Sequence, residues 1–459
     1  MLINSNMKLR IKAAELQHFS WLYKLAPCFP VKATKINVIT DPRTFYDTLC
    51  ERFKNADSRI SVASLYIGTG ELERRLLDVT KDNVVMKKNL KFSVLLDYQR
   101  GTRGEVNSKT LLQSFVNDVP ERSNICLYQT PRLHGSWSNA LPSRYNEIVG
   151  LQHMKLYIAD DSVLLSGANC SSDYFHQRQD RYIEIHDPDL ADFYSELIDV
   201  MSSYSKKCVG DAVTDHGLPS KEAVVAGVRD RVSAFTDKWM QHQEAKPIND
   251  AADTWVFPLL QMGEYGITQD EEATQAMLSS APEGSQLKLA TGYFNLTEDY
   301  TQTLLQRSKA MISLLMAHPN ANGFLGASFP AGGIPHAYSL IAKQFWQRVL
   351  ATGQAGRIQM LEYEREGWTF HAKGLWYYAP GAGLPCATVV GSANLGERSV
   401  RRDLEAQAAV LTVDPDLQRR LHSECTSLHD PAASCGASLL ARAVPLWVRA
   451  TVGLFRTYF

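Results

Sequence analysis

The chain lacks the cysteine patterns, charge excess and long apolar runs that mark several common protein classes. Its eight cysteines are scattered and form no C-x-x-C pair, which argues against a structural zinc site and favours free thiols in a reducing compartment. Lys and Arg total 48 against 49 Asp and Glu, so no overall basic field would attract a nucleic acid. No run of 18 uncharged apolar residues predicts a membrane-spanning helix, and the early apolar patches are too short for a secretory signal.

What the 459 residues contain is an ordinary globular composition, 45% hydrophobic and 10% aromatic, arranged as an internal repeat. A strand-like segment, a turn and a helical segment occur at 59–77 and recur at 286–305. In both places an apolar strand and a Gly-containing loop follow. Because strands alternate with helices in each half, we predict an α/β fold of two similar lobes, each a mixed β-sheet flanked by helices.

The repeat divides the chain into five predicted segments. They are an N-terminal arm, a first lobe, a connector helix, a second lobe and a C-terminal segment, at residues 1–35, 36–210, 211–246, 247–430 and 431–459. The first fourteen residues are basic without an acid, which is a faint sign of a mitochondrial presequence.

The C-terminal segment contains arginines seven residues apart among aromatic residues. If it is helical, these arginines share one stripe, and we expect it to contact an anionic membrane surface. A terminal helix that simply docks on the second lobe is the alternative. The residues concerned are Arg442, Trp447, Arg449, Phe455 and Arg456.

Two H-x-K pairs carry the chemical signal. His153 with Lys155 and His371 with Lys373 occupy corresponding places in the two halves. In an extended strand residues i and i+2 point to the same face, so each imidazole projects together with its ammonium group. One such pair would mean little, whereas a repeated pair in a duplicated context predicts a shared active site.

Each pair is followed by an apolar strand that ends in a turn of small residues and an asparagine. These turns allow the backbone and an Asn amide to approach a ligand closely. They supply Ser166 and Asn169 in the first half and Ser392 and Asn394 in the second.

The first motif, His153-x-Lys155-x4-Asp160, resembles the HKD motif of the phospholipase D superfamily. More narrowly, several strings resemble the eukaryotic mitochondrial CDP-diacylglycerol–glycerol-3-phosphate 3-phosphatidyltransferases. They lie at 64–70, 97–104, 153–182, 261–263, 322–324 and 371–376, and the resemblance runs from about residue 35 to the C-terminus. The second motif departs from the superfamily pattern, because Tyr378 stands where the Asp would fall. We therefore expect Asp160 to be a structural partner and the full motif to belong to the first lobe.

The resemblance implies one active site at a pseudo-twofold interface and a phosphohistidine intermediate. It suggests His153 as nucleophile and His371 as general acid and base, although the residues alone do not separate these roles. Two Lys ammonium groups and two Asn amides would stabilise the phosphoryl oxygens, with no metal and no cofactor. We expect Glu184 and Glu405 to hold the imidazole N–H groups.

The implied substrates are CDP-diacylglycerol and glycerol-3-phosphate, giving phosphatidylglycerophosphate and CMP at the matrix side of the mitochondrial inner membrane. Arg100 and Arg103 have no cationic counterpart in the second half, and we expect them to serve a second phosphate, with surface arginines as the alternative. Tyr66 and Tyr293, at the ends of corresponding strands, are further candidates for substrate binding. A homo-oligomer is possible, and no nucleic-acid partner is expected.

Three other functions remain open at this point. A CDP-diacylglycerol-dependent phosphatidylserine synthase would use serine as acceptor. A phospholipase D-like phosphodiesterase would use water. A non-enzymatic membrane scaffold would carry a decayed site, which the two intact H-x-K pairs argue against.

Overall fold

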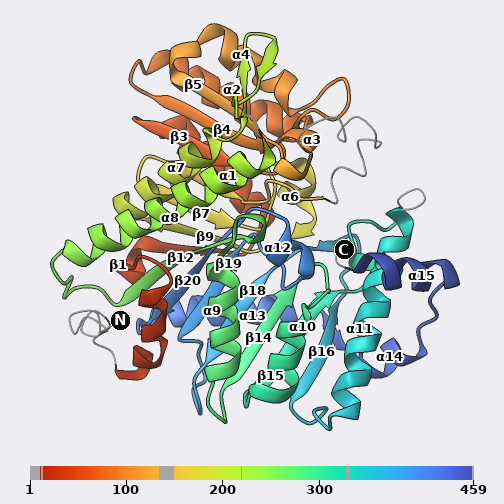
Figure 1. Cartoon of the computed structure of the whole chain (residues 1–459). Helices are drawn as coiled ribbons and strands as arrows, with labels where there is room; N and C mark the ends of the chain where they lie inside the picture. The colour runs from red at the N-terminus through yellow and green to blue at the C-terminus, as the bar shows by residue number, and fades with distance from the viewer. Residues whose placement is uncertain (1–10, 12–13, 134–148, 219, 327–330, 457–459) are drawn as a thin grey trace.

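The computed structural model describes residue 11 and residues 14–133, 149–218, 220–326 and 331–456, which form two lobes in contact (Figure 1). Both lobes are α/β, and the segments with the two H-x-K pairs run between them. The connector helix α8 (Lys221–Ala245) lies beside the first lobe, against α7 (Pro188–Ser202).

Within the described residues, the first lobe is built on a nine-stranded sheet of order β11-β10-β5-β4-β3-β6-β7-β9-β2. β3, β4 and β5 are parallel, and the strands on either side of them pair antiparallel. The strands are β2 (Ile36–Ile39), β3 (Arg59–Ala63), β4 (Lys91–Asp97), β5 (Ser123–Tyr128), β6 (Leu156–Ala159), β7 (Ser162–Ser166), β9 (Tyr182–His186), β10 (Lys206–Val209) and β11 (Ala212–Thr214). The helices of this lobe are α1 (Pro42–Asn55), α2 (Glu71–Met86), α3 (Tyr98–Gly101), α4 (Ser108–Asp118), α6 (Ser172–His176) and α7.

The second lobe repeats this strand order in a ten-stranded sheet, again counted over the described residues. Its path is β1-β12-β20-β19-β18-β14-β15-β16-β21, with β13 paired to β12. The strands are β1 (Phe29–Val31), β12 (Thr254–Met262), β13 (Ile267–Thr268), β14 (Gln286–Thr291), β15 (Met311–Ala317), β16 (Ile358–Tyr363), β18 (Gly374–Tyr378), β19 (Ala387–Gly391), β20 (Glu405–Thr412) and β21 (Ala432–Ser434). The helices are α9 (Gln269–Ser280), α10 (Glu298–Gln302), α11 (Ile334–Ala351), α12 (Glu397–Arg401), α13 (Pro415–His429), α14 (Gly436–Ala441) and α15 (Leu446–Phe455).

Three buried apolar clusters hold this arrangement together. One lies within the first lobe and one within the second. The third joins the lobes, since it combines β6, β7 and β9 with β19, β20, α7, α8 and α13. Burial of apolar surface contributes roughly 25 cal/mol per Å², so the joining cluster stabilises the contact between the lobes.

The repeated sequence Asp-Pro-Asp-Leu starts the corresponding helices α7 and α13. Asp187 accepts a hydrogen bond from the Leu190 N–H, and Asp414 accepts one from the Leu417 N–H. Proline fits the first helical position because it has no N–H to satisfy there. The helix starts are thus encoded locally and identically in both lobes.

The predicted N-terminal arm packs into the second lobe instead of standing apart, as far as it is described. Leu16, Phe19 and Leu22 of the 3₁₀ segment Ala14–Lys24 are buried in that lobe's core. β1 pairs antiparallel with β12. An apolar segment that finds an open sheet edge pairs with it, because unpaired edge groups are costly when covered.

The C-terminal segment also docks on the second lobe. Val448 and Val452 face inward from α15, and α14 and α15 both pack on α11. Of the arginines predicted to contact a membrane, Arg442 is ion-paired with Glu362 at 2.7 and 2.8 Å and Arg456 bonds Asn295 and Leu296, so both bind the protein's own surface. Leu446, Trp447 and Arg449 remain on the outer face, and the side chain of Phe455 lies outside the described residues. In the described part of the chain, no helix has the length and apolar character needed to cross a bilayer.

Candidate active site

The two H-x-K segments cross from one lobe to the other just before β6 and β18. In the first, His153 N–H donates to the Leu404 carbonyl at 2.9 Å. In the second, β17 (Thr369–Phe370) pairs in parallel with β8 (Arg178–Gln179), and His371 N–H donates to the Gln179 carbonyl at 2.8 Å. Each histidine is therefore anchored by the backbone of the opposite lobe, which differs from the prediction that the pairs lie within strands.

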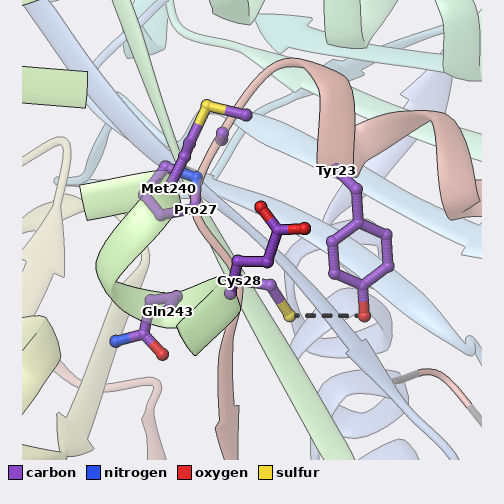
Figure 2. A pocket seen from close by; sticks show the side chains of 7 residues that line it. Tyr23, Pro27, Cys28, Met240 and Gln243 are labelled. Atoms are coloured by element: carbon purple, nitrogen blue, oxygen red, sulfur yellow. Dashed lines mark hydrogen bonds between the residues drawn. The ribbon is translucent and has the colours of Figure 1, made fainter. Parts of the chain in front are cut away.

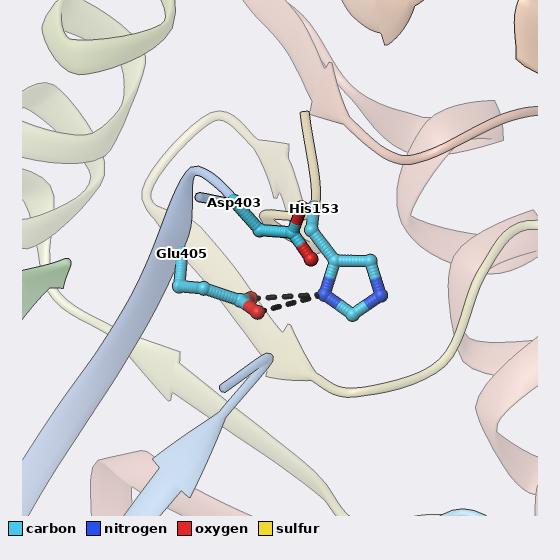
Figure 3. Close-up of side chains that lie close together, drawn as sticks. All are labelled: His153, Asp403 and Glu405. Atoms are coloured by element: carbon cyan, nitrogen blue, oxygen red, sulfur yellow. Dashed lines mark hydrogen bonds and ion pairs between the residues drawn. The ribbon is translucent and has the colours of Figure 1, made fainter. Parts of the chain in front are cut away.

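This crossing exchanges the carboxylates between the lobes. Figure 3 shows Glu405 of the second lobe facing His153 of the first, with Glu405 oxygens 2.9 and 3.0 Å from His153 Nδ1. In the mirrored half-site, Asp180 of the first lobe lies 2.6 Å from His371 Nδ1. Because Nδ1 is held in both rings, Nε2 is the nitrogen left for chemistry in each.

The structure corrects the expectation for Glu184, which does not contact an imidazole of the site. Glu184 binds Arg52 and Ser162 within the first lobe and lies beside His186. The residue that sequence reasoning missed is Asp180. It stands eleven residues after Asn169, as Glu405 stands eleven after Asn394, and this equal spacing was the available signal.

The two lysines brace their own motifs. Lys155 Nζ donates to the His153 carbonyl at 2.7 Å, and Lys373 Nζ donates to the His371 carbonyl at 2.6 Å. Lys373 Nζ also lies 2.7 Å from His371 Nδ1, and both ammonium groups are fully buried. Lys373 Nζ also lies 3.9 Å from the Asp180 carboxylate, so buried amines and carboxylates alternate around the two imidazoles.

Burial shifts the titration of these groups in opposite directions. It lowers the pKa of both imidazoles, and the neighbouring lysine ammonium groups lower them further. It lowers the pKa of Lys373 to about 8, raises the pKa of Asp180 to about 6 and raises the pKa of Glu405. The charge of His153 also lowers the pKa of His371, as the charge of Lys373 does for His153, so the two half-sites form one electrostatic unit.

The turn residues occupy supporting positions around the imidazoles. Ser392 Oγ donates to Glu405, whereas Ser166 Oγ donates to the Arg181 carbonyl. Asn394 accepts from Thr291 at 3.1 Å. The Asn169 amide donates to Tyr174, and its carbonyl oxygen is buried with no partner among the described residues, so it retains bonding capacity for a ligand.

Aromatic side chains line the His371 side of the site. The ring of Tyr293 packs edge-on at 5.5 Å from the His371 ring, and that of Tyr174 at 5.1 Å, with its hydroxyl 3.4 Å from His371 Nε2. Tyr66 lies under the Arg100 guanidinium at 4.8 Å, while Arg103 is exposed.

Asp160 lies apart from the imidazoles, in the predicted structural role. Its carboxylate accepts hydrogen bonds from Ser58 and from the N–H groups of Asp57 and Arg59. It adopts a left-handed conformation, φ 48°, at the turn between β6 and β7. In the second lobe the corresponding Tyr378 ends β18, and its hydroxyl lies 3.1 Å from His422 Nδ1.

One group of side chains has the donor types that a cation would need. Ligand atoms of His153, Asp403 and Glu405 lie within 4.8 Å of one another (Figure 3). Both carboxylates already accept hydrogen bonds, Asp403 from Arg398 and the Leu151 N–H and Glu405 from Ser392 and Ser399. This donor set is thus used within the protein, and we assign it no metal.

A shallow pocket lies far from this chemistry in the fold, where the N-terminal segment meets α8. Figure 2 shows Tyr23, Pro27, Cys28, Met240 and Gln243 around it, with the Cys28 thiol 3.6 Å from the Tyr23 hydroxyl. None of the residues singled out by the motifs lines this pocket.

Comparisons with known proteins agree with this geometry, although no family model matches the chain. The mitochondrial CDP-diacylglycerol–glycerol-3-phosphate 3-phosphatidyltransferase of Homo sapiens is 40% identical, covering 97% of this chain and 86% of its own length. The enzyme of Mus musculus is 38% identical and covers 97% of this chain and 87% of its own length. The enzyme of Saccharomyces cerevisiae is 34% identical and covers 88% of this chain and 83% of its own length.

Among solved structures, the phosphatidylserine synthase of Haemophilus influenzae Rd KW20 is similar with a TM-score of 0.72. It covers 96% of this chain and 97% of its own, at 19% identity. At that identity the likeness concerns the fold alone, and it confirms the predicted α/β architecture of two similar lobes.

Proposed function

We infer, because this chain belongs to the family of CDP-diacylglycerol–glycerol-3-phosphate 3-phosphatidyltransferases, that it transfers the phosphatidyl group of CDP-diacylglycerol to glycerol-3-phosphate. The products are CMP and phosphatidylglycerophosphate, from which phosphatidylglycerol and cardiolipin derive. The observation that supports this mechanism most directly is the pair of imidazoles, each of which contacts a carboxylate of the opposite lobe through Nδ1.

In the first half-reaction, His153 Nε2 attacks the phosphorus bearing the diacylglycerol. The N–P bond forms, the bond between phosphorus and the CMP oxygen breaks, and the proton of His371 goes to that oxygen. Glu405 stabilises the charge that develops on His153 as it forms the phosphatidyl-enzyme. Burial lowers the pKa of His153 and so favours the neutral nucleophile, while Asp180 at 2.6 Å from His371 Nδ1 stabilises the protonated form that the acid needs.

In the second half-reaction, neutral His371 takes the proton of the glycerol-3-phosphate hydroxyl. The oxygen attacks phosphorus, the N–P bond breaks, and both imidazoles return to their starting states. Asp180 holds His371 in position throughout. General acid and base assistance of this kind contributes about 10²- to 10⁴-fold to the rate.

We assign the stabilisation of the phosphoryl oxygens to Lys155, Lys373 and the amides of Asn169 and Asn394. The two buried ammonium groups offset the charge of the transition state in a water-poor site. Ser392 acts indirectly, by holding Glu405.

We also propose that the protein acts in mitochondria, on the matrix face of the inner membrane. The names of the vertebrate relatives include the word mitochondrial, which supports the first part of this proposal. The lipid substrate requires contact with a bilayer. Leu446, 80% exposed, and Trp447, 43% exposed, lie beside the exposed Arg449 on the outer face of α15, which suits an anionic surface. Flotation with cardiolipin-containing liposomes tests this role. We expect the intact chain to float and the Leu446→Ser/Trp447→Ser variant to float less, and equal flotation would contradict the role.

The decisive experiment for the function uses labelled CDP-diacylglycerol with glycerol-3-phosphate, serine or water as acceptor. We expect phosphatidylglycerophosphate with the first acceptor only. Label in phosphatidylserine would identify a serine-using enzyme, and phosphatidic acid a phosphodiesterase. No product with any acceptor would favour a scaffold.

A further inference from the structure

The two half-sites differ in charge at one equivalent position. Nine residues beyond the turn asparagine, the first lobe has Arg178 and the second has Asp403. Each stands two residues before the carboxylate that crosses to the opposite imidazole, so Arg178 belongs to the His371 side and Asp403 to the His153 side. Asp403 is ion-paired with Arg398 at 2.9 Å, whereas the carboxylate near Arg178 is exposed, so the two sides differ in how their charges are paired.

Arg178 is held in place by neighbours that leave its charge available. Its guanidinium lies over the Tyr174 ring at 4.7 Å, and its Nε donates to Thr369 Oγ1 at 3.0 Å. The carboxylate of Asp173 is 3.7 Å away, but that side chain is 66% exposed, so solvent weakens the pair. The Arg178 side chain itself is only 16% exposed.

Space beside this guanidinium is kept open by a glycine at the surface. A Cβ built on Gly323 would lie 3.1 Å from Arg178 Nη2 and 3.6 Å from the Tyr293 hydroxyl. Gly323 is exposed, so Arg178 and Tyr293 meet where the site reaches solvent. Tyr293 and Tyr174 then connect this point to His371, since both rings pack edge-on against that imidazole.

We propose that Arg178 binds the phosphate group of the acceptor and thereby selects a phosphorylated polyol over an unphosphorylated one. The proposal rests on the proposed function, in which His371 receives the acceptor's proton. An acceptor with its hydroxyl at His371 places its own phosphate farther out on the same side, toward Arg178. A guanidinium suits this role because its planar fork donates two parallel hydrogen bonds to a phosphate.

The same cation has a second possible ligand of the same chemistry. In the first half-reaction the CMP phosphate leaves from the His371 side. A role toward CMP would appear in donor turnover, whereas a role toward the acceptor would appear in acceptor choice. The charge of Arg178 also lowers the pKa of His371, so a general effect on rate must be separated from phosphate recognition.

The test compares glycerol-3-phosphate with glycerol in Arg178→Gln, Arg178→Lys and the unmodified enzyme. We expect Arg178→Gln to raise the KM for glycerol-3-phosphate at least tenfold and to lower the preference for glycerol-3-phosphate over glycerol, in kcat/KM, by a similar factor. Arg178→Lys should fall between. The preference is a ratio, so a change in the basicity of His371 that affects both acceptors cancels.

Exchange of labelled CMP into CDP-diacylglycerol, which needs no acceptor, isolates the donor half. We expect exchange by Arg178→Gln to stay within about threefold of the unmodified enzyme, and Arg43→Gln, on the outer surface of α1, serves as the matched control. If exchange falls while the acceptor preference and KM are unchanged, Arg178 serves CMP or the fold and the proposal is overturned. Failure of the unmodified enzyme to use glycerol-3-phosphate would instead overturn the proposed function. A melting temperature for each variant separates unfolding from both results.

Discussion

The two lobes share a strand order and a motif spacing, yet their half-sites are not equivalent. Both contribute a histidine, a lysine and a carboxylate, and each carboxylate serves the histidine of the other lobe. Five residues after the lysine, the first lobe has Asp160 and the second has Tyr378. Two residues before the crossing carboxylate, the first lobe has Arg178 and the second has Asp403. The two lobes therefore share the histidine, lysine and carboxylate that act on one phosphorus atom. They differ in the residues next to these groups, which give the two sides of the site different surroundings.

A third difference concerns how the lobes are fastened together. Directly after the crossing carboxylate, the first lobe has Arg181 and the second has Ala406. Arg181 is fully buried in the second lobe, where it pairs with Glu424 at 2.9 Å and lies 3.8 Å from the centre of the Trp376 ring. It also donates to the Lys373 carbonyl, so the fastening reaches the catalytic segment.

The largest expected effect comes from removing one imidazole at a time. His153→Ala should abolish CMP exchange, because no nucleophile remains to form the phosphatidyl-enzyme. His371→Ala should slow both halves by about 10²- to 10⁴-fold while still allowing a labelled acid-labile adduct to form. Rapid quenching with labelled CDP-diacylglycerol measures the adduct, and an adduct on His153→Ala but not on His371→Ala would reverse the two roles.

Exchanging the crossing carboxylates for amides should be the next most damaging change. We expect Asp180→Asn and Glu405→Gln each to lower kcat by about 10²- to 10⁴-fold, because the imidazole of the opposite lobe loses its partner at Nδ1. Glu184→Gln is the matched control from the same segment, with an expected change in kcat below about threefold. A loss in Glu184→Gln as large as in Asp180→Asn would refute the cross-lobe assignment.

Breaking the ion pair between Arg181 and Glu424, which joins the lobes, should lower the free energy of unfolding. Arg181→Met leaves Glu424 buried and unpaired, and we expect the free energy of unfolding to fall by about 3–5 kcal/mol. Arg181→Met/Glu424→Gln should recover part of that loss, since the uncompensated charge is gone. Denaturant unfolding of both variants measures this, and equal stability of the single and double variants would argue against a coupled pair.

The last prediction depends on pH and concerns a buried acid in each lobe. Burial raises the pKa of Asp97 in the first lobe and of Asp270 in the second to about 7. A carboxyl whose pKa is higher when folded favours the folded state at low pH, and this contribution is lost as pH rises from about 4 through 7, by about 1.36 kcal/mol per pH unit. Asp270 bonds Gln407, and an amide oxygen can accept that bond equally.

Asp270→Asn should therefore stabilise the protein at pH 8 relative to pH 5. Asp97 instead accepts from the N–H groups of Arg100 and Gln152 with its two oxygens, so Asp97→Asn should destabilise at both pH values. Thermal unfolding at pH 5 and pH 8 makes the comparison. A pH dependence of Asp270→Asn identical to that of the unmodified chain would show that this carboxyl does not titrate in the range.

Local patterns were sufficient to predict much of the fold. The repeated segments predicted alternating strands and helices, and the connector helix predicted at about 221–243 is α8. Spacing along the chain did not predict the carboxylate partner of His371, because that carboxylate belongs to the other lobe. The sequence analysis predicts that Glu184 holds an imidazole, whereas the structure shows Glu184 bonded to Arg52 inside its own lobe and Asp180 beside His371.

The sequence by itself determined the two lobes, the two H-x-K pairs and the family, because strand and helix periodicity, turn residues and motifs are local properties of the chain. Only the tertiary structure decided which carboxylate holds which imidazole, that Arg178 lies over the Tyr174 ring, and that Arg442 and Arg456 bind the protein's own surface. Those contacts join segments as much as 252 residues apart. The contacts of His153 and His371 with their carboxylates form when the lobes come together, and those of Arg442 and Arg456 form when the C-terminal segment docks on the second lobe. No local pattern encodes either pairing.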